Sequence, residues 1–85
     1  MRVKMKILKF SASWCQPCKM LAKTIEGMEV PYEITEIDID DQPEKAGKYQ
    51  VRGVPTMVLV DDKGAVVSRL VGMQTAYKIG EWLGE

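Results

Sequence analysis

Two cysteines, the only ones in the chain, lie two residues apart in the stretch Trp14-Cys15-Gln16-Pro17-Cys18. This spacing at the start of a helix is typical of reversible dithiol–disulfide chemistry. The thiolate is the nucleophile in that chemistry, and the unpaired N–H groups at a helix N-terminus stabilise it. We expect Cys15 to be exposed at the mouth of the helix. Cys18, one turn further in, should be more buried but able to resolve a mixed disulfide.

Hydrophobic patterning predicts the elements that position these cysteines. Apolar residues recur through Val3–Phe10, which indicates a strand that leads into the motif. Leu21, Ile25 and Met28 recur at the spacing of one helix face, which predicts a helix over about 15–28. The cysteines therefore lie at a strand-to-helix turn.

The rest of the chain continues this alternation. The further predicted elements are a strand over 32–40, a short helix over 43–49, strands over 56–60 and 65–71 joined by a hairpin, and a helix capped by Thr75. The order β-α-β-α-β-β-α indicates an α/β fold, with helices on both faces of a four-stranded mixed sheet. A right-handed crossover makes the first two strands parallel neighbours. One ordering of the strands then places the loop before Thr56 beside Cys15.

Composition limits what the chain can do. It has 46% hydrophobic and 28% charged residues, with 12 basic residues, 12 acidic residues and no histidine. These values predict a single globular domain over 1–85 and argue against nucleic acid as a partner. No apolar stretch approaches the length of a signal-peptide core or a membrane span, so we expect a cytoplasmic protein with no membrane partner. Two thiols without histidine do not complete a zinc site, so no metal and no cofactor is expected in a monomer.

With the motif and this order of elements in place, the sequence resembles the thioredoxin family over nearly its whole length. The matching segments are Trp14–Lys19, Ile37–Pro43, Tyr49–Thr56 and Val71-Gly72. The leading strand and helix of full-length thioredoxins are missing, so the chain is similar to a trimmed member of glutaredoxin size. The resemblance implies a minimal thioredoxin fold and a protein-disulfide reductase. Cys15 would attack protein disulfides, Cys18 would resolve the mixed disulfide, and a thioredoxin reductase or glutathione would supply electrons.

The resemblance also implies a substrate-binding surface around the thiols. A cis peptide bond between Val54 and Pro55 would turn the Val54 backbone outward, where an extended substrate strand pairs with it. The apolar residues of this surface would be Trp14, Pro17, Val54, Pro55, Val71, Gly72 and Met73. We expect Trp14 to be half-buried, and the alternative is simple core burial. For Met73 the alternative is a residue that only fills core space.

Two features depart from the thioredoxin pattern. Gln16 occupies a position that is usually glycine, so the Gln16-Pro17 dipeptide sets a redox potential somewhere between about −270 and −200 mV. Lys9 occupies the position where many thioredoxins bury an aspartate, and Glu36 occupies that of the facing lysine. We hypothesise that Lys9 and Glu36 form a partly buried ion pair behind the disulfide, where Lys9 favours the thiolate or relays the proton of Cys18. The alternative is that Lys9 extends to the sheet edge without a role.

Three other functions remain open on the sequence. Size favours a glutaredoxin-like protein that uses glutathione, whereas Gln16-Pro17 and the single Gly72 differ from the usual glutaredoxin turn and Gly-Gly loop. A dimer could bind zinc or an iron–sulfur cluster through the cysteines of both copies. A non-catalytic binding module is disfavoured because both cysteines are present.

Overall fold

The computed structural model describes residues 4–84. Its elements are, in chain order, β1 (Lys6–Ser11), α1 (Gln16–Glu26), β2 (Glu33–Asp38), α2 (Pro43–Lys48), β3 (Thr56–Val60), β4 (Val66–Val71) and α3 (Ala76–Trp82). The predicted order β-α-β-α-β-β-α is confirmed. Val3, which we placed in the first strand, lies outside the described residues.

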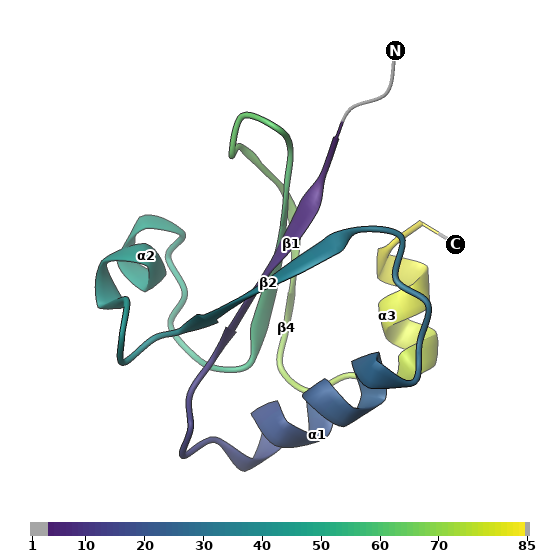
Figure 1. The fold of residues 1–85 in the computed structure, drawn as a ribbon, viewed down its shortest axis with the longest axis horizontal. Helices are drawn as coiled ribbons and strands as arrows, with labels where there is room; N and C mark the ends of the chain where they lie inside the picture. The colour runs from purple at the N-terminus through teal and green to yellow at the C-terminus, as the bar shows by residue number, and fades with distance from the viewer. Residues whose placement is uncertain (1–3, 85) are drawn as a thin grey trace.

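The four strands form one mixed sheet with the order β2-β1-β3-β4. β1 and β2 are parallel, whereas β1 with β3 and β3 with β4 are antiparallel. Figure 1 shows α2 on one face of the sheet and α1 and α3 on the other. The predicted four-stranded sheet with helices on both faces is therefore confirmed, and the end of β1 leads directly into the cysteine turn.

Alternating residues of the central strands build a separate core on each face of the sheet. Ile7 and Met57 pack with Leu21 of α1 and Ile79 of α3. On the other face the core is made by β1, β2 and β3, with α2 packed on it, and its buried members are Leu8, Phe10, Ile37, Val58 and Val60. Strands covered on both faces bury successive residues, which explains why every residue of β3 is buried.

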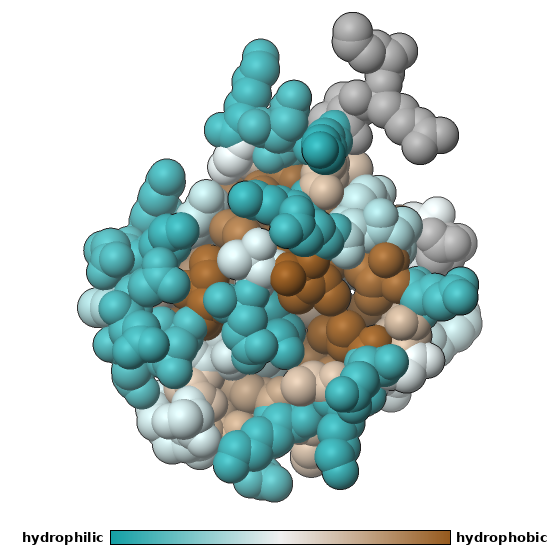
Figure 2. Space-filling model, in the orientation of Figure 1, coloured by the Kyte–Doolittle hydropathy of each residue, from teal (hydrophilic) through white to brown (hydrophobic). Residues whose placement is uncertain are grey.

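Hydrophobic residues occupy the middle of the visible face, and hydrophilic residues lie around them (Figure 2). Within residues 4–84, no helix is long and apolar enough to cross a membrane.

The first helix and the second strand each end two residues before the predicted end. The first helix ends at Glu26 because Gly27 caps it, rather than continuing to Met28. β2 ends at Asp38, whose carboxylate Oδ1 accepts a hydrogen bond from the Asp40 backbone N–H at 2.8 Å. Such a side-chain contact competes with continuation of the strand and begins a turn.

The predicted hairpin and the predicted cap of the last helix are both present. The Asp61 carboxylate accepts hydrogen bonds from the backbone N–H groups of Lys63 and Ala65, both at 2.9 Å, and closes the turn between β3 and β4. The Thr75 hydroxyl accepts a hydrogen bond from the Lys78 N–H at 3.2 Å at the start of α3. Local side-chain chemistry therefore sets these boundaries.

Candidate redox site

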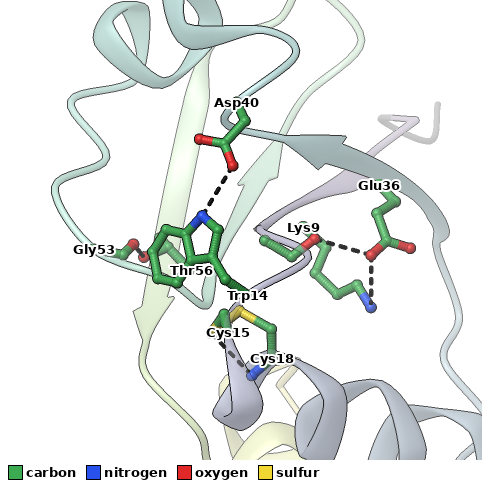
Figure 3. The surroundings of a disulfide bond; sticks show 9 residues. Lys9, Trp14, Cys15, Cys18, Glu36, Asp40, Gly53 and Thr56 are labelled. Atoms are coloured by element: carbon green, nitrogen blue, oxygen red, sulfur yellow. Dashed lines mark hydrogen bonds and ion pairs between the residues drawn. A yellow bond between two sulfur atoms is a disulfide. The ribbon is translucent and has the colours of Figure 1, made fainter.

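Cys15 and Cys18 are joined by a disulfide at the N-terminus of α1, with their Cα atoms 5.3 Å apart (Figure 3). Cys15 is the N-cap of the helix, and its Sγ accepts a hydrogen bond from the Cys18 backbone N–H at 3.2 Å. Pro17 lies in the first turn, where its missing N–H costs no helical hydrogen bond. The sulfur of Cys15 thus occupies the place of a capping oxygen, where the helix stabilises negative charge.

Both cysteines are buried in this disulfide form. Cys15 is 3% exposed and Cys18 is 5% exposed, so the expectation of an exposed Cys15 and a more buried Cys18 is wrong. The reason is tertiary packing: the two cysteines cluster with Ala12, and Ile39 and Val54 pack against them. A substrate must therefore be held closely against the surrounding surface before Cys15 can react.

Trp14 is more exposed than its sequence context suggested. It is 66% exposed, so the expected half-burial and the alternative of core burial are both wrong. Its indole Nε1 donates a hydrogen bond to Asp40 Oδ2 at 2.9 Å, and the ring lies beside the cysteines (Figure 3). This role of Asp40 was not predicted, because Asp40 is one of several acidic residues that alternate along and after β2 and nothing in that pattern distinguishes it.

The loop that leads into β3 lies beside the cysteine turn, as predicted. The Val54–Pro55 peptide bond is cis, which confirms the expectation drawn from the family resemblance. Val54 packs against the cysteine cluster, and Pro55 is buried. The Pro55 carbonyl accepts a hydrogen bond from the Gly72 N–H at 2.8 Å. Gly72 has a φ of 85°, a conformation that favours glycine.

The structure brings most of the predicted substrate-binding surface together. Val71 is 58% exposed and pairs with Thr56, the residue after Pro55. Gln16 and Pro17 begin α1, next to the disulfide. Met73 instead is partly buried against the core between the sheet and α1 and α3, which agrees with the core-filling alternative for that residue.

The hypothesised ion pair between Lys9 and Glu36 is present. The two residues lie opposite each other in β1 and β2, and Lys9 Nζ is 3.7 Å from Glu36 Oε2. The Lys9 side chain is 7% exposed and the Glu36 side chain is 61% exposed, so Lys9 does not extend into solvent. Ser11 was not predicted as part of this site, and its hydroxyl donates a hydrogen bond to the same Glu36 oxygen at 2.9 Å. Because Ser11 follows Lys9 by two residues in one strand, the strand period could have revealed it.

A cleft of about 380 Å³ is lined by both Glu36 of this ion pair and Cys18 of the disulfide. Its wall includes Cys18 and Lys19 of α1, Glu36 and Asp38 of β2, and Ser11 of β1. The cleft therefore offers Cys18 a polar path to solvent that does not pass over the Trp14 side of the site. Within residues 4–84, no group of three or more His, Cys, Asp or Glu side chains is arranged to hold a metal ion.

A mixed sheet of this topology, with a disulfide at the N-terminus of its first helix and a cis proline beside it, defines a dithiol–disulfide exchange protein. The sequence profile of the thioredoxin family matches residues 2–85. The chain is 37% identical over 81 residues to a thioredoxin from Staphylococcus aureus, and the match covers 91% of this chain and 77% of that protein.

Solved structures agree with the sequence match. A mutant thioredoxin from Halobacterium salinarum NRC-1 superposes with a TM-score of 0.85 at 34% identity, covering 94% of this chain and 72% of that one. Thioredoxin from Fasciola hepatica gives a TM-score of 0.83 at 34% identity, covering 94% and 78%. The chain belongs to the thioredoxin family. It is a thiol–disulfide oxidoreductase that reduces protein disulfides, and its partners are disulfide-bearing substrates and a reductase.

Proposed function

We propose that Cys15 is the attacking nucleophile and Cys18 the resolving thiol of this reductase. The observation that carries the assignment is the hydrogen bond from the Cys18 N–H to Cys15 Sγ at 3.2 Å. In the reduced protein the same N–H, at the positive end of α1, stabilises the Cys15 thiolate. Cys18 lies within the helix and has no equivalent capping position.

The reaction proceeds by two exchanges of sulfur partners. The Cys15 thiolate attacks one sulfur of the substrate disulfide, whose S–S bond breaks and whose other sulfur leaves as a thiolate. The Cys18 thiolate then attacks Cys15 Sγ, which forms the Cys15–Cys18 disulfide and releases the second substrate sulfur. Two electrons thus pass from the protein dithiol to the substrate, and a reductase returns them.

We place substrate binding on the surface around Cys15. Exposed apolar side chains are supplied by Trp14, which precedes the buried Cys15, and by Val71, which pairs with Thr56. An extended substrate segment fits against them and pairs with the Val54 backbone next to Pro55, so that its disulfide meets Cys15. Pro17 and Gly72 complete this docking surface, and Met73 supports it from the core.

We further propose that the Lys9–Glu36 pair serves Cys18. Lys9 lies opposite Met57, on the face of the sheet that α1 covers, and its positive charge favours the thiolate over the neutral thiol. Glu36 holds the ammonium in place and is itself held by Ser11. The cleft between Glu36 and Cys18 gives water a route for the proton that Cys18 releases.

Single cysteine variants test the assignment directly. Cys18→Ser should form a stable mixed disulfide with a protein substrate such as insulin, because the resolving thiol is absent. Cys15→Ser should form no such complex. Mass spectrometry of the mixture, before and after addition of dithiothreitol, detects the complex. A trapped complex with Cys15→Ser and none with Cys18→Ser would reverse the two roles.

For the electron donor we propose an enzyme of the thioredoxin reductase type, with glutathione as the alternative. The support is the similarity of this chain to thioredoxins. We also propose that the protein acts as a monomer in the cytoplasm. Re-reduction assays with NADPH and thioredoxin reductase, or with glutathione and glutathione reductase, distinguish the donors, and analytical ultracentrifugation gives the mass in solution.

A further inference from the structure

The loop between α2 and β3 carries Val54 to the cysteines, and its first residue adopts an unfavourable backbone conformation. Gln50 has a φ of 55°, the one positive value at a non-glycine residue within 4–84. The left-handed region costs free energy for a residue with a Cβ atom. Contacts with the rest of the molecule must therefore hold the start of this loop.

Those contacts come from β4. The Arg69 guanidinium donates a hydrogen bond to the Tyr49 carbonyl at 2.7 Å through one terminal nitrogen and to the Gln50 carbonyl at 3.4 Å through the other. Three residues further along the chain, the Gly72 N–H binds the carbonyl of Pro55 at the other end of the loop. A single strand and the residue after it therefore hold both ends of the segment that carries Val54.

The chemistry of arginine suits this position. Tyr49 is the C-cap of α2. The last carbonyls of a helix have no helical partners, and they lie at the negative end of the helix dipole. A planar guanidinium offers N–H groups to two acceptors at once, and its charge strengthens both hydrogen bonds. Arg69 pairs with Val58 across the β3–β4 ladder, which places its side chain on the α2 face of the sheet.

We propose that Arg69 is a positioning residue for protein substrates: it fixes the start of the 50–55 loop, and thereby the Val54 backbone on which an extended substrate pairs. The inference rests on the proposed docking at Val54 and extends it to a residue that touches neither cysteine. A small disulfide needs only the Cys15 thiolate, whereas a protein disulfide also needs the Val54 backbone. Arg69 therefore acts on KM for proteins and leaves the thiol chemistry unchanged.

The test compares two substrates in four variants of the full chain. Arg69→Met removes both hydrogen bonds, and we expect KM for insulin to rise about tenfold, which corresponds to the loss of one strong hydrogen bond. The kcat for insulin, the rate with a small aromatic disulfide and the reduction potential should stay unchanged. Arg69→Lys, which retains one charged donor, should recover part of the affinity and serves if Arg69→Met does not fold.

Ser68→Ala is the matched control. Ser68 is the preceding residue of β4 and faces α3, where its hydroxyl accepts a hydrogen bond from Trp82 Nε1 at 2.7 Å. Its loss should lower the free energy of unfolding without a change in KM. A rise in KM for insulin with Arg69→Met or Arg69→Lys, and none with Ser68→Ala, supports the proposal. An unchanged KM, or equal losses with both substrates, overturns it.

Val54→Asp separates this inference from the docking on which it rests. The new carboxylate lies on the proposed docking surface, and KM for insulin should rise. If Val54→Asp raises KM and the Arg69 variants do not, the role of Arg69 is wrong and the docking surface stands. If Val54→Asp leaves KM unchanged, docking at Val54 is itself wrong, and the positioning role of Arg69 falls with it.

Discussion

Two regions meet at the disulfide, and they are built in opposite ways. The cysteine turn is local: Cys15 caps its own helix and accepts a hydrogen bond from Cys18, three residues away. The 50–55 loop is held from a distance, by Arg69 at its start and Gly72 at its end. The capping of Cys15 is therefore encoded within a few residues, whereas the position of the 50–55 loop depends on packing across the sheet.

The strongest challenge to this division is Gly72→Val. Valine adopts a φ near 85° only with strain, so the free energy of unfolding should fall by about 2 kcal/mol and the N–H that binds Pro55 should move. We expect KM for insulin to rise while the reduction potential stays constant. Chemical denaturation and insulin-reduction kinetics measure the two effects.

Gly64→Val is the matched control for Gly72→Val. Gly64 has a φ of 84° in the β3–β4 hairpin, outside the docking surface, so the same substitution introduces comparable backbone strain. Stability should fall by a similar amount with KM unchanged. Equal kinetic losses in both variants would mean that Gly72 affects activity only through global stability.

The next effect concerns the ion pair between Lys9 and Glu36. Lys9→Met removes the cation at the Cys18 side of the site, and we expect the cysteine thiolates to form at higher pH because a favourable charge is lost. Thiolate absorbance as a function of pH measures this shift. An unchanged titration would show that the Lys9–Glu36 pair has no part in the chemistry.

Glu36→Gln is the companion variant for this ion pair. It leaves the buried ammonium without a carboxylate, so it should lower the free energy of unfolding more than Lys9→Met does, by about 1 kcal/mol given the exposure of Glu36. Urea denaturation of both variants gives the comparison. If Lys9→Met lowers the free energy of unfolding more than Glu36→Gln does, the stabilising role of Glu36 toward the buried ammonium is wrong.

The smallest expected effect is at Trp14, where the two regions share a docking surface. Asp40→Leu removes the carboxylate that accepts the indole hydrogen bond, so the exposed ring should sample more orientations. We expect KM for insulin to rise about twofold, with a stability change of at most about 1 kcal/mol, because the contact is exposed. Asp62→Leu, an exposed aspartate in the β3–β4 hairpin, is the control. A similar rise in KM for Asp62→Leu would show that loss of negative charge alone causes the effect.

Sequence patterns predicted the elements well because their signals are local. The apolar run of β3 and the turn residues that follow it predicted that strand with the bounds observed, Thr56–Val60. The Thr75 cap was predicted, whereas the end of β2 was missed, where the Asp38 carboxylate accepts a hydrogen bond from the backbone N–H of Asp40. Exposure at the site was also predicted wrongly, for Cys15 and for Trp14 in opposite directions.

The sequence by itself was sufficient to indicate the chemistry and the order of the elements, and its resemblance to thioredoxins indicated the Lys9–Glu36 pair. Spacing, helix capping and strand period act over a few residues, and the parallel pairing of β1 with β2 follows from one crossover. Three features could be found only in the folded molecule. They are the burial of Cys15, the contact of Trp14 with Asp40, and the hydrogen bonds from Arg69 to the start of the loop that carries Val54. Each joins residues more than a dozen positions apart, or depends on several elements packing at one point, and the patterns of a single segment do not contain such information.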